Sequence, residues 1–223
     1  LLLLAMTAQS SPLPAWLDRA RPLAALLLAV APVYALAMIY YAGSPRTTDV
    51  GYSPRQPVEY SHLLHAGELG LDCRFCHTTV ETAAFAAVPP TPTCMNCHAR
   101  IASESDKLLA LRQSFSSGEP IRWVKVHDLP DYAYFDHRAH VGRGVGCVSC
   151  HGRVDTMEQV TQVERLSMAW CLECHCNPEP HLRPQQFITV MDWVSNESPA
   201  VLGSRLRQQN NIQPSTDCST CHR

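Results

Sequence analysis

The sequence predicts a mostly helical and irregular fold, in which one N-terminal transmembrane helix precedes a region of short helices with little β-structure. Three observations support this fold class. An uncharged apolar run of 20 residues lies near the N-terminus, alternating strand patterns are nearly absent, and all 11 cysteines follow the apolar run.

The composition narrows the class of protein. Of the 223 residues 46% are hydrophobic and 17% are charged, which is typical of a chain that buries a core and not of a disordered one. The 18 basic residues do not exceed the 20 acidic ones, so we expect no nucleic-acid partner. The 11 cysteines and 11 histidines indicate an oxidising compartment or a prosthetic group.

The apolar run is residues 23–42, and it contains no charged side chain. A helix of this length spans about 30 Å, which is the hydrocarbon thickness of a bilayer. Pro32 is tolerated in a membrane helix, and Tyr40 and Tyr41 fall where an interfacial aromatic belt belongs. We therefore predict a transmembrane helix over residues 23–42 that contacts membrane lipid.

Two other interpretations of the run are a buried core helix and a cleaved signal peptide, because Ala35-Leu36-Ala37 fits a cleavage pattern. We expect the helix to be retained. Arg19 and Arg21 outweigh Asp18, and the positive-inside rule then places residues 1–22 in the cytoplasm. The rest of the chain is expected on the periplasmic side of a bacterial inner membrane.

Residues 43–60 contain three prolines and two glycines, which predicts a linker. Residues 61–223 hold all the cysteines and histidines and are expected to form one periplasmic domain. Apolar spacing predicts a helix over residues 101–115 and a shorter one over residues 156–168. With so few regular elements, we expect a prosthetic group to fill the interior.

Ten of the cysteines belong to five copies of C-x-x-C-H, numbered motifs 1 to 5 in chain order. They are Cys73/Cys76/His77, Cys94/Cys97/His98, Cys147/Cys150/His151, Cys171/Cys174/His175 and Cys218/Cys221/His222. This is the attachment signature of c-type haem. Each pair of thiols adds to the two vinyl groups of one haem, and the adjacent histidine is the proximal ligand of its iron.

Zinc binding and disulfide formation are the alternatives for paired cysteines. Neither requires a histidine directly after every second cysteine, and at 11 histidines in 223 residues five such coincidences are improbable. We therefore predict five covalently bound c-type haems. Cys176 has no partner motif and is expected to be a bystander thiol.

Six histidines lie outside the motifs and are candidates for the second axial ligand of the irons. Four of them form two aromatic-x-His-x-x-His units, and each unit precedes a pair of motifs. The pattern indicates an internal duplication over residues 60–98 and 135–175, with residues 218–222 as an appended fifth unit. Histidines three positions apart suit two neighbouring irons better than one. The candidate distal ligands are His62, His65, His127, His137, His140 and His181, together with Met157 as a thioether alternative.

These residues resemble a known family, the pentahaem cytochrome c subunits of bacterial alternative complex III. The matching stretches are residues 94–98, 129–137 and 168–175, and the likeness extends over nearly the whole chain after residue 20. The resemblance implies proximal ligation by the motif histidines and distal ligation by the paired ones. It also implies partners, namely iron–sulfur and integral membrane subunits that oxidise quinol, and a periplasmic carrier or terminal oxidase that accepts the electrons. The chain departs from the pattern in having six candidate histidines for five positions.

If every iron has two protein ligands, none can bind substrate, so we expect an electron-transfer subunit that is not catalytic alone. One alternative is a stand-alone membrane quinol dehydrogenase. Another is a nitrite- or hydroxylamine-converting enzyme, which the absence of C-x-x-C-K disfavours. Residues 43–223 carry 16 basic and 19 acidic residues, hence −3, and ten haem propionates would make the domain more acidic.

Overall fold

The computed structural model describes residues 15–42 and 49–222, and these fall into two compact units, Leu1–Thr48 and Asp49–Arg223. Each unit is treated separately. Most of the predicted cytoplasmic segment, residues 1–14, and the first part of the predicted linker, residues 43–48, lie outside the described residues.

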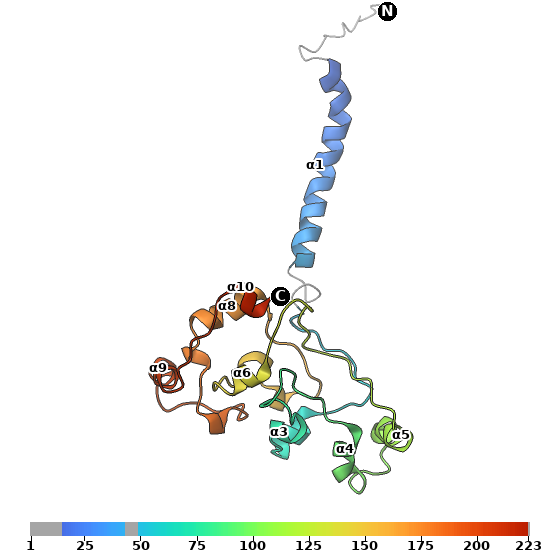
Figure 1. Ribbon diagram of the computed structural model, residues 1–223. Helices are drawn as coiled ribbons and strands as arrows, with labels where there is room; N and C mark the ends of the chain where they lie inside the picture. The colour runs from blue at the N-terminus through green and yellow to red at the C-terminus, as the bar shows by residue number, and fades with distance from the viewer. Residues whose placement is uncertain (1–14, 43–48, 223) are drawn as a thin grey trace, which may run out of the picture. The chain divides into compact units, whose positions relative to one another are not determined.

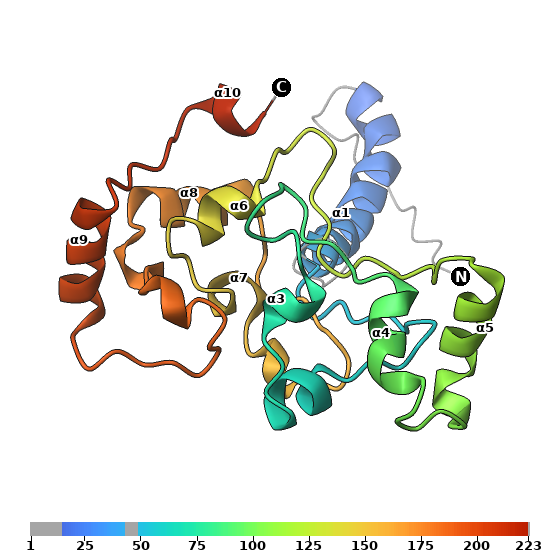
Figure 2. The same cartoon turned by 60° about the horizontal axis from the view of Figure 1, so that its bottom comes forward.

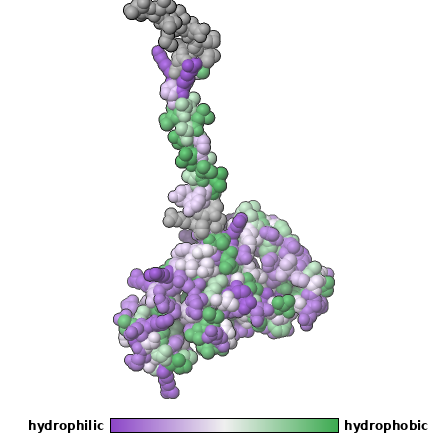
Figure 3. Space-filling model, turned by 180° about the vertical axis from the view of Figure 1, so that it is seen from behind, coloured by the Kyte–Doolittle hydropathy of each residue, from purple (hydrophilic) through white to green (hydrophobic). Residues whose placement is uncertain are grey.

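The first unit consists of one long helix, α1 (Ala15–Ala42), which begins earlier than the sequence predicts. Its segment Arg19–Ala42 has a mean hydropathy of 2.2 and is long and apolar enough to cross a membrane. Apolar side chains surround the helix and are exposed, as Figure 3 shows. Pro22 and Pro32 lie inside the helix without ending it. These features fit a membrane anchor, and a signal sequence has the same ones.

The second unit is built from short helical segments joined by irregular chain. The α-helices are α3 (Cys73–Cys76), α4 (Thr91–His98), α5 (Leu109–Ser117), α6 (His137–Val141), α7 (Val148–His151), α8 (Met168–Cys176), α9 (Pro199–Gln209) and α10 (Cys218–Cys221). A π-helix, η1 (Leu63–Glu68), and four 3₁₀ segments, η2 (Asp106–Leu108), η3 (Val154–Thr156), η4 (Glu179–His181) and η5 (Gln185–Phe187), complete the set. The described residues contain two isolated β-bridges and no strand, which confirms the predicted fold class.

Figures 1 and 2 show how the segments of this unit are arranged. Helices α4 and α5 pack together at one end and α9 lies at the other, with α3, α6 and α7 between them. Helix α9 packs on η4, and η1 packs on η3. The second of these contacts joins the first aromatic-x-His-x-x-His unit to the chain that follows motif 3.

The helix predicted over residues 101–115 is wrong in its first half. The α-helix begins only at Leu109, because Ala102 has a φ of 52° and Ser105 is extended, so the chain cannot continue a helix through them. The guanidinium of Arg112 donates to the carbonyl oxygens of Ser103 and Ser105 at 2.7 and 2.8 Å. Leu111 is the buried apolar residue of this helix, at 3% exposure.

The helix predicted over residues 156–168 is also wrong. After η3 the chain is irregular up to Ser167, and Met157 is already extended with a ψ of 124°. Long-range backbone bonds replace the helical ones, because Gly51 N–H donates to the Gln162 carbonyl and Gln162 N–H donates to the Tyr52 carbonyl. These bonds tie residues 49–60, which contain no helix, to the rest of the second unit.

The apolar core of this unit is small. The buried hydrophobic side chains among the described residues are Val58, Leu111, Val141, Leu182, Ile188, Met191, Leu202 and Ile212. Interiors of ordinary domains are close-packed by many more apolar side chains than these. A polypeptide core of this size fits a fold organised around prosthetic groups.

Candidate haem-binding sites

The five motifs lie on short helical segments. Motifs 1, 3 and 5 lie on the single turns α3, α7 and α10, and motifs 2 and 4 lie within α4 and α8. The carboxylate of Asp72 accepts the N–H of Arg74 at the start of α3, and the Ser167 hydroxyl accepts the N–H of Trp170 at the start of α8. A helical turn brings the two thiols of C-x-x-C to one side of the backbone. All eleven cysteines are free, so none forms a disulfide.

Most of the candidate ligand histidines share one hydrogen-bonding pattern. In seven of them Nδ1 lies 2.6 to 3.2 Å from a backbone carbonyl oxygen. A carbonyl can only accept, so each of these rings carries its proton on Nδ1 and keeps the lone pair of Nε2 free. Metal-ligating histidines almost always have such a partner on their second nitrogen. The seven are His65, His77, His98, His137, His140, His175 and His222.

The ring centres of three pairs of histidines lie at the spacing that two axial ligands require, with interplanar angles of 60°, 11° and 42°. A metal–imidazole bond is about 2 Å long and the nitrogen lies about 1.1 Å from the ring centre, so the ring centres of two ligands on one metal are about 6.2 Å apart. The ring-centre distance is 6.1 Å for His65 and His98, 6.4 Å for His137 and His151, and 6.1 Å for His140 and His175. Each pair joins one motif histidine to one histidine from an aromatic-x-His-x-x-His unit.

The two aromatic-x-His-x-x-His units have the same local geometry. Tyr60 stacks on His65 at 4.4 Å and meets His62 edge-on at 4.8 Å. Phe135 stacks on His140 at 4.4 Å and meets His137 edge-on at 4.8 Å. In both units the Nδ1–H of the second histidine donates to the carbonyl oxygen four residues earlier, at 2.8 Å. The aromatic residue therefore orients the rings of both histidines that follow it.

A cluster of histidines lies between motifs 1 and 3. The pKa of His151 is lowered to about 3, mainly by burial and to a smaller extent by neighbouring histidines, first among them His127. Burial also lowers the pKa of His62 to about 4, with a smaller contribution from His77. Nδ1 of His62 and Nε2 of His127 are buried without a hydrogen-bond partner. Buried imidazole nitrogens of this kind are costly unless something binds them, which makes both nitrogens candidate ligand atoms.

Three candidate distal ligands, His127, His181 and Met157, belong to none of the three histidine pairs. His127 meets His151 edge-on at 4.5 Å, so it competes with His137 for the place opposite His151. His181 ends η4, where its carbonyl accepts the N–H of Gly146 at 3.3 Å, but among the described residues its ring pairs with no other histidine. The carbonyl of Met157 accepts the N–H of Leu63, beside His62.

Thiols of different motifs lie close enough to influence one another's pKa, and these pairs show which motifs are neighbours. The linked pairs are Cys76 with Cys97, Cys73 with Cys147, Cys150 with Cys174, and Cys171 with Cys221. Burial is the main cause that raises the pKa of the Cys150 thiol to about 12, and nearby thiols add to it. The thiols of Cys73 and Cys147 are in hydrogen-bonding contact. The motifs therefore follow one another in the spatial order 2, 1, 3, 4, 5.

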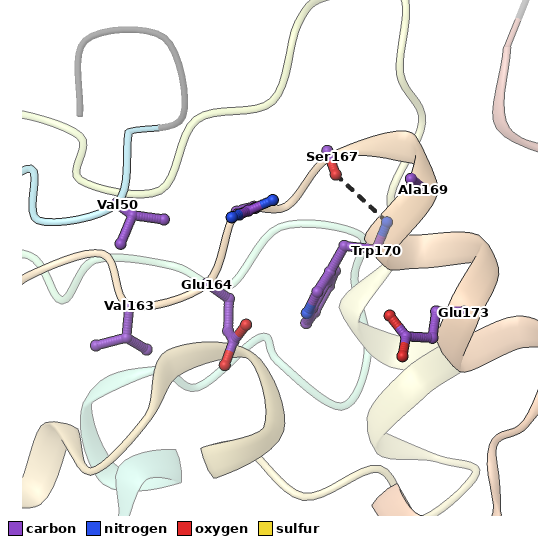
Figure 4. A pocket seen from close by; sticks show the side chains of 8 residues that line it. Val50, Val163, Glu164, Ser167, Ala169, Trp170 and Glu173 are labelled. Atoms are coloured by element: carbon purple, nitrogen blue, oxygen red, sulfur yellow. Dashed lines mark hydrogen bonds between the residues drawn. The ribbon is translucent and has the colours of Figure 1, made fainter. Parts of the chain in front are cut away.

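Helix α8 also borders an open groove of about 390 Å³, shown in Figure 4. The indole of Trp170 lies between the carboxylates of Glu164 and Glu173. Glu173 of motif 4 lines the groove, but the cysteines and the histidine of that motif do not.

Sequence reasoning missed the groups that fix the orientation of the histidines. Backbone carbonyl oxygens have no sequence signature, so their role at seven rings could not be read from residue types. The position of Tyr60 and Phe135 ahead of each histidine pair was visible as a repeated pattern, and that pattern was the signal for their stacking. The Cys73–Cys147 contact joins residues 74 positions apart and had no local signal.

The donor set fits haem better than a small metal ion. In the described residues no group of three or more His, Cys, Asp or Glu side chains is placed to hold one metal ion. Six of the histidines instead form three pairs with ring centres 6.1 to 6.4 Å apart, each with a C-x-x-C beside one member. This is the arrangement that two axial ligands and two thioether attachments need.

Comparisons with known proteins agree with this geometry. Residues 133–223 match a family described as "Cytochrome c7 and related cytochrome c". The "Menaquinone reductase, multiheme cytochrome c subunit" of Nitratidesulfovibrio vulgaris is 32% identical over 97 residues, which are 43% of this chain and 45% of that protein. The chain thus matches less than half of that curated relative's length. Residues 133–223 are thus similar to c7-type multihaem cytochromes, a family that implies covalently bound haem c, and the second unit is mostly helical and irregular.

Proposed function

We propose that this chain is a membrane-anchored pentahaem cytochrome c, the electron-relay subunit of a quinol-oxidising complex that resembles alternative complex III. The observation that carries the proposal is the spacing of 6.1 to 6.4 Å between the ring centres of three histidine pairs. Two protein ligands on an iron leave no site for substrate, so such a subunit carries electrons and does not transform a substrate itself.

The ring distances support a specific scheme of axial ligands. Motif 2 pairs His98 with His65, motif 3 pairs His151 with His137, and motif 4 pairs His175 with His140. For motif 1 we propose His62 opposite His77, because the two interact and Nδ1 of His62 is buried without a partner. For motif 5, where His222 is the proximal ligand, these distances assign no second ligand, and His127, His181 and Met157 are the candidates that the other four motifs leave over.

The order of the motifs supports a relay with two ends. When bound, each haem supplies one-electron exchange between ferric and ferrous iron. The pairs of interacting thiols support the order 2, 1, 3, 4, 5, in which motifs 2 and 5 are the ends. At motif 5, Cys218 is exposed, which suits exchange with a partner protein. The protein's own contribution is to hold ten thiols and the paired imidazoles in this series.

The partners and the location follow from the same features. Helix α1 would anchor the chain in the inner membrane with its N-terminus in the cytoplasm, and the cytochrome domain would lie in the periplasm. The similarity to a subunit named for menaquinone reductase supports iron–sulfur and integral membrane partners that exchange electrons with quinol. A periplasmic carrier or a terminal oxidase would be the acceptor.

Purification from native membranes tests this function. The protein is isolated with its companion subunits, and menaquinol oxidation is measured for the whole assembly and for this chain alone, with an artificial one-electron acceptor in each case. We expect the assembly to oxidise quinol and the isolated chain to accept electrons only from a chemical reductant. Quinol oxidation by the isolated chain would contradict the proposal and establish a stand-alone quinol dehydrogenase.

A further inference from the structure

The loop between motifs 1 and 2, residues 79–87, contacts two histidines that belong to different halves of the chain. The Nδ1–H of His77, in motif 1, donates to the Ala87 carbonyl oxygen at 2.8 Å. The Nδ1–H of His137, from the second aromatic-x-His-x-x-His unit, donates to the Ala84 carbonyl oxygen at 2.8 Å. One loop therefore sets the tautomer and the orientation of both rings.

The same loop also receives the first turn of α6. The backbone N–H of His137 donates to the Ala84 carbonyl at 3.0 Å, and that of Arg138 donates to the Ala83 carbonyl at 3.3 Å. The Ala84 oxygen thus accepts two hydrogen bonds from a single histidine. The position of His137 depends on a segment that lies 53 residues earlier in the chain.

One side chain holds this loop in shape. The hydroxyl of Thr79 donates to the Phe85 carbonyl at 2.7 Å and accepts the N–H of Ala87 at 2.9 Å. These bonds fix the two peptides that lie between the Ala84 and Ala87 carbonyls, which are the ones that the histidines use. Phe85 is 80% exposed, so burial of the loop's large side chain does not fix it.

We propose that Thr79 is a positioning residue for His77 and His137, and that its hydroxyl couples the iron ligands of motifs 1 and 3. This rests on the proposed function, in which both histidines ligate iron. A hydrogen bond to Nδ1–H makes an imidazole a more basic ligand, and hydrogen bonding at the ligands is one of the ways a protein tunes haem potentials. Loss of the Thr79 bonds would loosen both carbonyls together. The contact between the Cys73 and Cys147 thiols places the two motifs side by side, where a joint change matters most.

The test compares Thr79→Val, which removes the hydroxyl at nearly constant volume, with Thr79→Ser, which keeps it. Thr82→Val is the matched control, because the Thr82 hydroxyl lies in the same loop and makes only a 3.4 Å contact with the Thr79 carbonyl. The full chain with its haems is studied by haem counting, by electron paramagnetic resonance of the ferric form and by redox titration.

We expect Thr79→Val to keep five haems while two of the five change their low-spin signals and shift to higher potential. Thr79→Ser and Thr82→Val should match the wild type. Unchanged signals in Thr79→Val, or a change in one haem or in all five, would overturn the proposal. If Thr79→Val loses haem, haem-peptide mapping decides, because loss at motifs 1 or 3 supports the proposal and loss elsewhere refutes it. A wild type without five low-spin haems would instead refute the proposed function.

Discussion

Replacing His65 by alanine should remove one axial ligand from one of five irons. The His65 ring centre lies 6.1 Å from that of His98, which matches the estimate of about 6.2 Å for two imidazoles on one metal. An alanine side chain ends at Cβ and cannot reach the iron. The motif 2 iron then keeps a single strong protein ligand and becomes high-spin, so about one fifth of the total ferric haem should change spin state.

The assay is electron paramagnetic resonance on the oxidised protein, with the high-spin ferric signal integrated against total haem. The duplicated geometry gives an internal check, because His140 faces His175 at the same 6.1 Å. His140→Ala should therefore give the same fraction, and the double variant should give about two fifths, since the two sites are separate. Leu64→Ala is the control, because Leu64 neighbours His65 and its side chain is 43% exposed.

Two results would refute this reasoning. The first is a His65→Ala protein that carries five haems and remains entirely low-spin, which would mean that another group ligates the motif 2 iron. The second is a high-spin signal of the same size in Leu64→Ala, which would mean that any disturbance of η1 has this effect.

Three further predictions concern stability and partners. Gly203→Ala should destabilise the domain by about 1–3 kcal/mol, because the new Cβ would lie 2.7 Å from backbone atoms of Glu179 where α9 packs on η4. Chemical denaturation measures this loss, and an unchanged unfolding midpoint would contradict the packing. The pKa of Asp72 is held at about 2, chiefly by hydrogen bonds from Arg74. The wild type should therefore be more stable than Asp72→Asn, by an amount that is full above pH ~4 and vanishes as the pH falls towards 2. A stability difference that grows in acid would refute this. Residues 43–223 have a net charge of −3 before ten propionates are added. The rate of association with a basic soluble electron carrier, measured by stopped flow, should therefore fall as salt is added. An association rate that does not depend on salt would count against an acidic docking face.

The sequence predicted best the features that depend on local spacing. Each of these features is local in the chain: the five motifs, the apolar run of α1 and the two aromatic-x-His-x-x-His units. In the structure the two aromatic-x-His-x-x-His units have matching geometry. The scarcity of alternating patterns correctly predicted that β-structure would be minimal. Helices over residues 101–115 and 156–168 were predicted from apolar spacing alone. They failed where Ala102 adopts positive φ and where Gln162 pairs with Gly51 and Tyr52 instead.

The arrangement of the sites depends on contacts between distant residues and was not predictable from one sequence. His65 faces His98 from 33 positions away, and His137 is held by Ala84 from 53 positions away. Carbonyl oxygens make the contacts that orient the rings, and every residue type has one. The contact of Cys73 with Cys147 places motif 3 beside motif 1 and so joins the two halves of the chain.

The central claim is that each of the five motifs carries one covalent haem. Intact-mass spectrometry of the purified chain, combined with a haemochrome assay and mapping of haem peptides, tests it directly. We predict five haems per chain, thioether modification of all ten motif cysteines and an unmodified Cys176. A chain with fewer than five modified motifs, or one whose motif cysteines hold zinc or disulfides, would contradict it.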